Sequence, residues 1–372
     1  MIATPHPAYA AAAISCVLTL ALTPAVRALC TRLQIFDAPG PLKIHAQPVP
    51  RLGGAAVFIA IFAAVAFASP RGGPSIATFL AAFSLVWLAG FLDDLRHLSP
   101  AIRVAAQCAA GAFVWMGGWR VSILGSSSLG LIAVCIAIPA FANAFNLLDG
   151  MDGLATGTAA IIAAACLALP AGTLSPIARV VAASFAGACL GFLPSNWPIA
   201  KIFLGDEGST LLGFTIAFLG VDICRARSSS PPALAFPLLA AAVPLLDSGL
   251  AAIRRVRWRS SPLFGDRRHV YDLIRARGCS APKILALLYG ITAAMCVLAL
   301  FSVYKPSEGT AVGAAAAAAI LILAGIKLGS LEKESPTGAA NVPIGVVEST
   351  SPPAKSTASK LEYNEVHKAG TA

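Results

Sequence analysis

Charged residues are scarce in this chain of 372 residues: they make up only 12% of it, whereas an ordinary soluble domain carries about 25%. This scarcity, together with 57% hydrophobic residues and a mean hydropathy of +0.78, excludes a soluble globular enzyme and a disordered protein. The apolar runs are too long for a transmembrane barrel, whose strands alternate in segments of about ten residues. The composition therefore predicts an all-α polytopic membrane protein.

Two further features are missing from the sequence. The nine cysteines include no C-x-x-C pair and most lie inside apolar runs, which favours buried free thiols over a disulfide framework or a metal cluster. No basic residue precedes the first apolar run, so we expect that run to be a retained span and not a cleaved signal. The net charge of +10 is typical of cytoplasmic loops in a membrane protein, and we therefore expect no nucleic-acid partner.

Eleven apolar runs, each long enough to cross about 30 Å of hydrocarbon, predict about eleven transmembrane helices. Their approximate bounds are 9–27, 53–69, 76–92, 101–117, 130–148, 154–170, 177–193, 208–224, 232–253, 282–304 and 309–328. After these runs the composition changes to Ser, Thr, Pro, Glu and Lys without periodicity. We therefore expect one transmembrane domain over residues 1–328 and a disordered tail over residues 329–372.

The charges are divided unequally between the two sides of such a bundle. Loops after odd-numbered spans carry 16 Lys and Arg residues before residue 327, and loops after even-numbered spans carry 6. The positive-inside rule places the odd loops and the C-terminus in the cytoplasm and the N-terminus outside. Of the twelve acidic residues before residue 329, nine lie in the same odd loops or at their membrane edges. Carboxylates that converge on one face among many cations indicate a metal and phosphate site.

The third run ends in a pair of adjacent carboxylates, within F-L-D-D-L-R-H-L-S-P. Asp93 and Asp94 abut an apolar segment, where ionised carboxylates need a cation or a bound metal. Arg96 and Arg103 could supply that cation without any catalytic role, so a structural reading stays open.

The fifth run leads into N-A-F-N-L-L-D-G-M-D-G-L-A, which carries four oxygen-bearing side chains. Asn143, Asn146 and Asp149 are three residues apart and share one helix face, and Asp152 follows in a second Asp-Gly step. Few charges and many oxygens are typical of Mg²⁺ completed by substrate phosphates. The spacing does not fit a calcium EF-hand loop, and a polar helix cap and turn is the structural alternative.

Hydrogen-bond donors are concentrated in the first odd loop, K-I-H-A-Q-P-V-P-R-L-G-G. Its Pro and Gly content predicts an ordered, non-helical path, on which Lys43, His45 and Arg51 could bind phosphate. An ordinary basic turn is the alternative. The segment F-L-G-D-E-G-S begins a later helix with small residues that allow close phosphate approach around Asp206; a helix N-cap role for Asp206 is the structural alternative.

The longest cytoplasmic loop before the tail is strongly basic. Its first part, residues 254–259, is explained as well by attraction to the membrane surface as by diphosphate binding. Its second part contains D-R-R-H, with Arg267, Arg268 and His269, and then Tyr271, for which membrane attraction is a poorer explanation.

These five elements, in their order along residues 37–278, beginning with K-I-H-A-Q-P-V-P-R-L-G-G and ending with D-R-R-H, resemble the polyprenyl-phosphate N-acetylhexosamine-1-phosphate transferase superfamily (glycosyltransferase family 4). The sequence is most similar to the bacterial undecaprenyl-phosphate GlcNAc-1-phosphate transferases. The resemblance implies eleven spans and a catalytic site on the cytoplasmic side of the inner (plasma) membrane. Three consecutive histidines of the peptidoglycan branch are absent, which argues against that branch's substrate.

The resemblance also implies roles for residues at matching positions. Asp206 and Asn146 would hold Mg²⁺, for which Mn²⁺ could substitute, and Asp93 and Asp94 would be the catalytic carboxylates. The remaining residues would bind substrate; they are Lys43, His45, Arg51, Asn143, Asp149, Asp152, Arg267, Arg268 and His269. One departure is that the family's His-x-His-His element reads His269-Val270-Tyr271-Asp272 here, which leaves the sugar open.

The expected reaction moves a sugar 1-phosphate, GlcNAc-1-phosphate first among the choices, from a UDP-sugar donor to undecaprenyl phosphate. It releases UMP and starts a cell-envelope glycan such as lipopolysaccharide O-antigen, and a homodimer is a further expectation. The alternatives are the same chemistry with another UDP-N-acetyl sugar, a secondary transporter, a CDP-alcohol phosphatidyltransferase and a non-catalytic membrane scaffold. Polar residues at one membrane edge argue against a transporter, and the Asp-Gly context differs from that of the phosphatidyltransferases.

Overall fold

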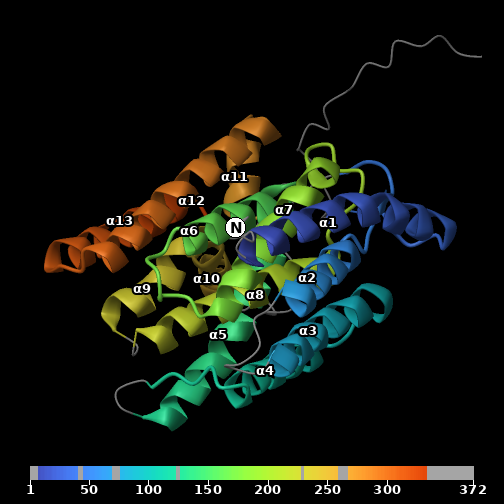
Figure 1. Ribbon diagram of the computed structural model, residues 1–372. Helices are drawn as coiled ribbons and strands as arrows, with labels where there is room; N and C mark the ends of the chain where they lie inside the picture. The colour runs from blue at the N-terminus through green and yellow to red at the C-terminus, as the bar shows by residue number, and fades with distance from the viewer. Residues whose placement is uncertain are drawn as a thin grey trace, which may run out of the picture.

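The computed structural model describes residues 7–40, 45–68, 76–122, 126–227, 230–258 and 267–332, and the long helices pack side by side in one bundle (Figure 1). The elements are α1 (Pro7–Arg32), β1 (Phe36–Asp37), β2 (Val49–Pro50), α2 (Gly54–Ala68), α3 (Ile76–Arg96), α4 (Pro100–Met116), α5 (Ser127–Leu148), α6 (Leu154–Leu167), α7 (Pro176–Asn196), α8 (Gly205–Ala226), α9 (Pro231–Ala240), α10 (Ala242–Arg257), α11 (Val270–Ala276), α12 (Ala281–Tyr304) and α13 (Glu308–Lys327). Each of the eleven apolar runs coincides with one helix, except the ninth, which coincides with the pair α9 and α10.

The helices confirm an all-α polytopic membrane protein. In the described part of the chain seven helices are long and apolar enough to cross a membrane, and the pair α9–α10 would make an eighth. Helices α2 and α6 are apolar but shorter. The count of eleven spans and the orientation of the termini therefore stay predictions.

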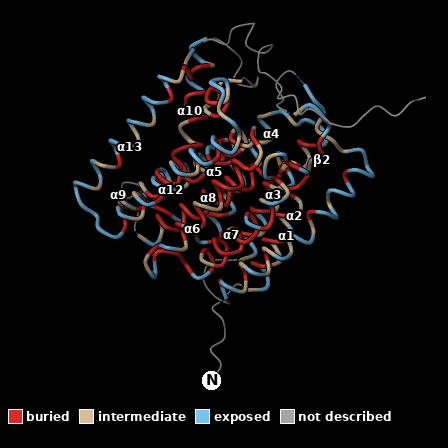
Figure 2. Tube along the Cα trace, turned by 90° about the horizontal axis from the view of Figure 1, so that it is seen from above, coloured by how far each residue is buried: buried red, intermediate tan, exposed pale blue. Residues whose placement is uncertain are grey.

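Helix α8 lies at the centre of the bundle. It packs against α2, α3, α5 and α9, and most of its residues are buried (Figure 2). A helix that is apolar on every side is stable only when other helices surround it, or lipid does. Close packing also depends on glycine: a Cβ on Gly54 of α2 would lie 2.5 Å from the Cα of Gly208. Small residues let helix backbones approach in a membrane, and here they bring the N-termini of α2 and α8 together.

The ninth apolar run is broken where proline interrupts it. Pro244 is the third residue of α10, lacks an N–H group, and its ring crowds the carbonyl four residues earlier, at Ala240. The helix accordingly ends at that residue, and the axes of α9 and α10 differ by 75°. After the bend, α10 packs against α5, the helix that carries Asn143 and Asn146.

The loop between α1 and α2 follows an ordered, non-helical path, as its composition predicts, in its described residues 45–53. Strands β1 and β2 pair antiparallel, with Phe36 opposite Pro50. The backbone N–H of Phe203 donates to the Pro50 carbonyl, and Gly54 donates to the Leu204 carbonyl. These hydrogen bonds fasten the loop to the segment that precedes α8.

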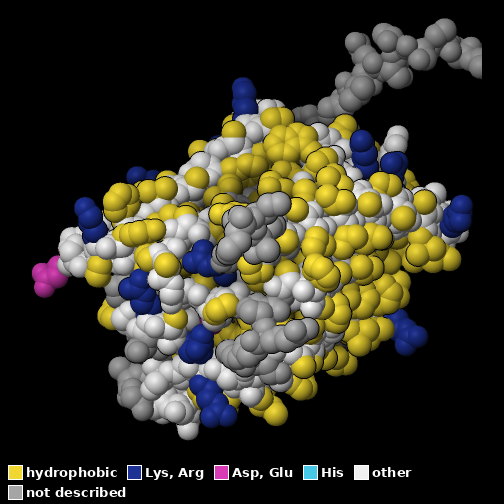
Figure 3. All heavy atoms as spheres, viewed as in Figure 1, with side chains coloured by type: hydrophobic (Ala, Val, Ile, Leu, Met, Phe, Trp, Pro, Cys, Tyr) yellow, Lys and Arg dark blue, Asp and Glu magenta, His cyan; other side chains and the backbone are white. Residues whose placement is uncertain are grey.

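The outer surface is largely apolar. Figure 3 shows a broad band of hydrophobic side chains across one face, with Lys and Arg mostly around it. Large apolar residues such as Val17, Leu20 and Phe67 are exposed. Apolar surface on this scale is what a bundle in contact with lipid presents.

Candidate active site

The last turn of α3 and the start of α4 place the two adjacent carboxylates beside an arginine. Asp93 and Asp94 are both buried, between α4 and α8. Ser99 caps α4, and the short turn brings Arg103 back to Asp93, with Nη1 2.6 Å from Oδ2. Arg103 therefore supplies the neighbouring cation, whereas Arg96 is exposed.

Asp94 is bound to the N-terminus of α8. Its Oδ2 accepts a hydrogen bond from the backbone N–H of Glu207 at 3.0 Å, and Arg51 lies 3.8 Å from its Oδ1 and donates to its backbone carbonyl. Gly205 has φ +78°, and a Cβ there would lie 2.8 Å from Asp94 Oδ2, so glycine serves both the backbone conformation and the close approach. The carboxylate that meets the orphan N–H groups of α8 therefore comes from α3, and Asp206 is not an N-cap.

Asp206 is consequently available to groups outside its own helix. Its Oδ1 accepts a hydrogen bond from Asn146 Nδ2 at 2.7 Å, and its Oδ2 lies 3.5 Å from Arg103 Nη1. The same Asn146 amide nitrogen lies 3.0 Å from Ser209 Oγ. The Asp206 side chain is 38% exposed, in contrast to the buried Asp93 and Asp94. Arg103 thus links carboxylates of α3 and α8, and Asn146 links α5 to the same point.

The donor set around Asp206 fits a hard divalent cation that substrate completes. Among the residues that the structure describes, no three His, Cys, Asp or Glu side chains form a ready metal-binding set. Mg²⁺ characteristically takes one or two carboxylates and fills its other positions with water and phosphate oxygens. Asp206 has the exposure for this, and Asn146 would contribute its amide oxygen after rotation of the amide.

The D-G-M-D-G loop adds two more carboxylates to the same end. Asp149 follows the last residue of α5, and Asp152 Oδ2 accepts a hydrogen bond from the backbone N–H of Ala200 at 2.9 Å. Burial raises the pKa of Asp149 well above its usual range, and the carboxylates of Asp206, Asp152 and Asp94 raise it further. Burial also raises the pKa of Asp152, against the opposing effect of the Ala200 N–H. This excess of negative charge favours a bound cation.

Asn143 and Asn146 share one face of α5, as their spacing predicts, but Asn143 lies one turn deeper. Its Nδ2 donates to Gln107 Oε1 at 2.9 Å and to the Pro139 carbonyl at 2.8 Å. Neither of these hydrogen bonds involves a carboxylate of the site, and the role of Asn143 in substrate binding stays a prediction.

His45 lies against the segment before α8. Its Nε2 is 3.0 Å from Asp37 Oδ2, and its ring meets Phe203 edge-on with 5.0 Å between ring centroids. The second expected phosphate contact, Arg51, reaches Asp94 as described above. The third, Lys43, lies outside the described residues.

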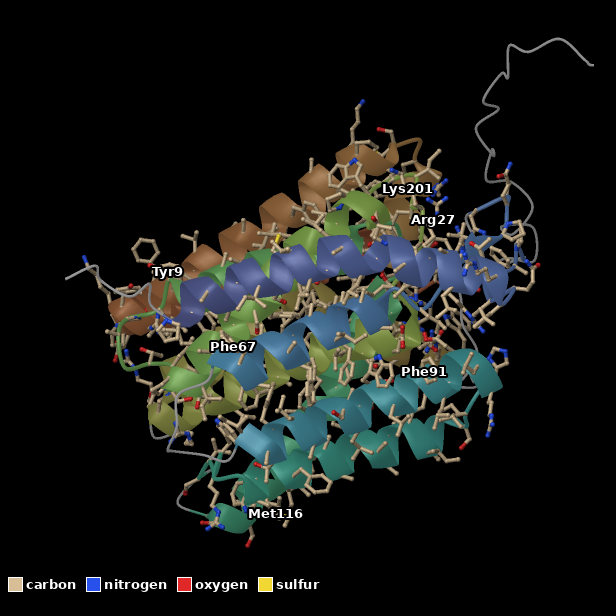
Figure 4. All side chains as sticks on the ribbon, turned by 45° about the vertical axis from the view of Figure 1, so that its right-hand side comes forward. Tyr9, Arg27, Phe67, Phe91, Met116 and Lys201 are labelled. Carbon is tan, nitrogen blue, oxygen red and sulfur yellow. The ribbon has the colours of Figure 1, made fainter. Side chains whose placement is uncertain are left out.

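The expected site residues that the structure describes gather at one end of the bundle. Figure 4 shows Arg27, Phe91 and Lys201 at that end and Tyr9, Phe67 and Met116 at the other. Phe91 lies on α3 next to Asp93, and Lys201 lies on the segment that leads to Asp206. Carboxylates from three separate segments therefore meet at the same edge.

Side chains at the end of the basic loop after α10 contact two different parts of the molecule. Arg267 Nε lies 3.1 Å from Asp272 Oδ1, and His269 Nδ1 lies 2.7 Å from Asp247 Oδ2. Arg268 instead contacts the segment after α13, where it donates to the Gly329 carbonyl at 2.7 Å. The structure thus brings His269 to the site end of the bundle with a buried partner, and it directs Arg268 away from the carboxylates.

Residues 328–332, which we call the C-terminal clasp, are held by side chains of this loop and of α10. Arg277 donates to the Leu328 carbonyl, Arg254 to that of Ser330 and Trp258 to that of Leu331. Ser330 is buried. The sequence placed residues 329–332 in the tail, yet they lie against the bundle; residues 333–372 lie outside the described residues.

Tyr271 and Asp272 occupy the positions where the family pattern has histidines. Tyr271 Oη donates to the Leu147 carbonyl at the end of α5, at 3.3 Å, and a Cβ on Gly150 would meet that hydroxyl. Burial raises the pKa of Asp272, and Arg267 lowers it. Tyr271 and Asp272, the two residues that depart from the family pattern, therefore each have a partner: the Leu147 carbonyl for Tyr271 and Arg267 for Asp272.

Asp247 lies inside the ninth apolar run, and none of the five sequence elements includes it. An acidic residue in a span is costly and usually paired, so the signal was present. Its partner, His269, lies beyond the basic loop, and no local pattern connects the two.

The chain is similar to known membrane transferases. The family described as "Glycosyl transferase family 4" matches residues 76–223. The chain is 31% identical to decaprenyl-phosphate N-acetylglucosaminephosphotransferase of Mycolicibacterium smegmatis, over 73% of this chain and 76% of the relative. It is 28% identical to a probable undecaprenyl-phosphate N-acetylglucosaminyl 1-phosphate transferase of Bacillus subtilis, over 74% and 79%. It is 27% identical to undecaprenyl-phosphate alpha-N-acetylglucosaminyl 1-phosphate transferase of Escherichia coli, over 75% and 80%.

Proposed function

Because the chain belongs to the polyprenyl-phosphate N-acetylhexosamine-1-phosphate transferases of glycosyltransferase family 4, we propose that it transfers GlcNAc-1-phosphate from UDP-GlcNAc to undecaprenyl phosphate and releases UMP. The relatives have names that specify this class of reaction on a polyprenyl phosphate. The finer choices, UDP-GlcNAc as donor and the undecaprenyl acceptor, are part of the proposal. So are the inner membrane, a cytoplasmic active site and a homodimer.

One observation carries the proposal: Asp93 and Asp206 meet at Arg103, and Asn146 donates to Asp206, at one end of an apolar bundle. Both reactants are polyanions, and the reaction must bring their phosphates together against repulsion. A lipid phosphate arrives from the hydrocarbon and a nucleotide arrives from water. A site at the bundle end, with cations and a cation-binding carboxylate, fits both approaches.

We assign Mg²⁺ to Asp206 and Asn146, with Mn²⁺ as a substitute. When bound, the ion would neutralise the charge of the donor diphosphate. Arg103 and Arg51 would hold the remaining phosphate oxygens, since guanidinium groups match phosphate in geometry. Asp149 and Asp152 would position the nucleotide sugar from the loop after α5.

The two adjacent carboxylates have different surroundings, and we propose different tasks for them. Asp94 is engaged with the N-terminus of α8 and orients the helix that carries Asp206. Asp93 shares Arg103 with Asp206 and is the better candidate to meet the acceptor phosphate. It would either orient and deprotonate that phosphate or attack the donor first to give a covalent intermediate.

The deciding experiment measures UMP release by the purified protein from UDP-GlcNAc, with and without undecaprenyl phosphate. We expect release that depends on both the lipid and Mg²⁺. Absence of release with every UDP-sugar tested would refute the proposal and favour a scaffold or transporter. Exchange of labelled UMP into UDP-GlcNAc without lipid would indicate the covalent route, and its absence the direct one.

A different UDP-N-acetyl sugar is the second candidate substrate. It is favoured by Tyr271 and Asp272, which replace histidines beside the loop that carries Asp149. A panel of UDP-N-acetylhexosamines in the same assay ranks the donors by kcat/KM. The preferred sugar is the one with the highest value.

A further inference from the structure

The carboxylate in the ninth apolar run, Asp247, contacts two consecutive residues at the start of α11. Asp247 lies in α10, the second half of the bent pair, and is buried. Its Oδ2 lies 2.7 Å from His269 Nδ1, and its Oδ1 accepts a hydrogen bond from the backbone N–H of Val270 at 2.8 Å. The two oxygens of Asp247 therefore hold both the ring of His269 and the backbone that follows it.

The imidazole ring is also held through its neighbour. It lies nearly parallel to the ring of Tyr271, with 8° between the planes and 5.6 Å between the centroids. Tyr271 donates to the carbonyl of Leu147, the residue that follows Asn146 on α5. His269 is thereby linked to α10 by Asp247 and, through Tyr271, to the helix that carries the proposed metal-binding amide.

Capping of α11 alone does not explain an acidic residue at position 247. Helix α11 has only seven residues, and the side chain of His269, the residue at its N-cap position, makes no capping hydrogen bond. A neutral asparagine would accept the Val270 N–H equally well, since asparagine and aspartate are comparable as helix caps. A carboxylate in an apolar span is costly by comparison. What a carboxylate adds is a strong acceptor for a ring N–H, which fixes the tautomer and orientation of a histidine.

We propose that Asp247 is a positioning residue of the transferase, which holds a proton at Nδ1 of His269 and so makes Nε2 the nitrogen that meets the donor's phosphate oxygens. The inference rests on the proposed function, in which His269 binds substrate. Asp247 touches neither substrate nor metal, and its effect passes entirely through the imidazole.

Kinetics of Asp247→Asn, His269→Gln and the double variant test this dependence. We expect Asp247→Asn to lower kcat/KM by about 10- to 100-fold, the usual cost of losing a carboxylate that orients a histidine. We expect the double variant to be no slower than His269→Gln alone, because one residue acts through the other. Effects that multiply in the double variant, or wild-type turnover by either single variant, would overturn the proposal.

The matched control is Asp222→Asn. Asp222 is another buried carboxylate in the apolar helices, and its Oδ2 also accepts a backbone N–H, that of Ser175 at 2.7 Å. It lies in the last turn of α8, whereas the site is at the first turn. We expect this variant to keep kcat/KM per folded molecule. If Asp222→Asn lowered kcat/KM as much as Asp247→Asn does, removing any buried carboxylate would have the same effect. The positioning role of Asp247 would then be refuted.

Nitrogen-15 NMR of histidine-labelled protein supplies a readout that does not depend on activity. The chain has five histidines, and His269→Gln identifies the signal. We expect the wild-type protein to show a proton on Nδ1 and Asp247→Asn to lose that state. A wild-type signal with the proton on Nε2 alone overturns the inference even if Asp247→Asn does not fold. If no UDP-sugar yields UMP while the Nδ1 proton is present, the proposed function fails and the Asp247–His269 pairing stands.

Discussion

The two ends of α8 each carry an aspartate, and their surroundings are opposite. Asp222 in the last turn is fully buried, and both of its oxygens have fixed partners: Trp119 Nε1 at 3.0 Å and Arg225 at 3.1 Å on Oδ1, and the Ser175 N–H on Oδ2. Asp206 in the first turn is partly exposed, and it shares Arg103 with another carboxylate. Of these two aspartates, only Asp206 has accessible oxygens among crowded carboxylates, and only Asp206 is placed to bind a cation.

The largest expected effect comes from neutralising the accessible acid. Asp206→Asn keeps the shape of the side chain but removes the charge that would bind the cation, and we expect kcat/KM for UMP release to fall about 1,000-fold. The melting temperature should change little, because the side chain is partly exposed. Steady-state assays and thermal unfolding of the same preparation measure both quantities. If Asp206→Asn kept turnover near the wild-type level, Asp206 would have no catalytic role that sets it apart from Asp222.

A substitution of the buried aspartate at the other end of α8 tests its structural role. Asp222→Ala leaves the Trp119 N–H and the Ser175 N–H without their acceptor and Arg225 without its counter-ion. We expect the free energy of unfolding to fall by about 3 kcal/mol, as when one member of a buried pair is removed. Denaturant unfolding in detergent measures the change. An unchanged free energy of unfolding would show that the contacts of Asp222 do not stabilise the fold.

Two glycines with nearly equal positive φ angles distinguish the effect of backbone strain from that of a displaced site residue. Gly205 has φ +78° next to Asp94, and Gly172 has φ +80° with nothing within 4 Å of an added Cβ. We expect alanine at either position to cost about 1–2 kcal/mol of stability. Only Gly205→Ala should also displace Asp94 and lower kcat/KM, by about 10- to 100-fold. Equal kcat/KM values for the two variants would show that the close approach of Gly205 to Asp94 does not matter for activity.

The smallest expected effect concerns two tyrosine hydroxyls. Tyr271 donates to the Leu147 carbonyl beside the site, and Tyr304, at the end of α12, donates to the Ala168 carbonyl at 2.8 Å. Phenylalanine at either position should cost about 0.5–1 kcal/mol of stability. We expect a change in KM for the UDP-sugar only for Tyr271→Phe. A comparable change for Tyr304→Phe would show that KM responds to stability alone.

Much of the architecture follows from local pattern. Apolar length predicts the helices, because each run must bury or shield its backbone in the same way whatever its neighbours are. The spacing of Asn143 and Asn146 predicts their shared face, since helical periodicity is a local property. Convergence of the acidic loops follows from counting spans and requires no knowledge of packing.

The partners of individual side chains do not follow from local pattern. Arg103 and not Arg96 meets Asp93, because the packing of α4 beside α3 brings Arg103 to that carboxylate, whereas Arg96, at the end of α3 itself, is exposed. Asp94 binds the N-terminus of α8, a contact across more than a hundred residues of sequence. Such choices depend on how helices from distant parts of the chain pack, and helix packing angles vary within broad classes.

The C-terminal clasp has a consequence for biosynthesis. Leu328, Ser330 and Leu331 are among the last of the described residues to leave the ribosome, yet their carbonyls hold arginines and a tryptophan on either side of the loop that ends at His269. These contacts of Arg254, Trp258 and Arg277 can form only after α13 has been translated. A nascent chain that stalls within α13 would therefore lack all three.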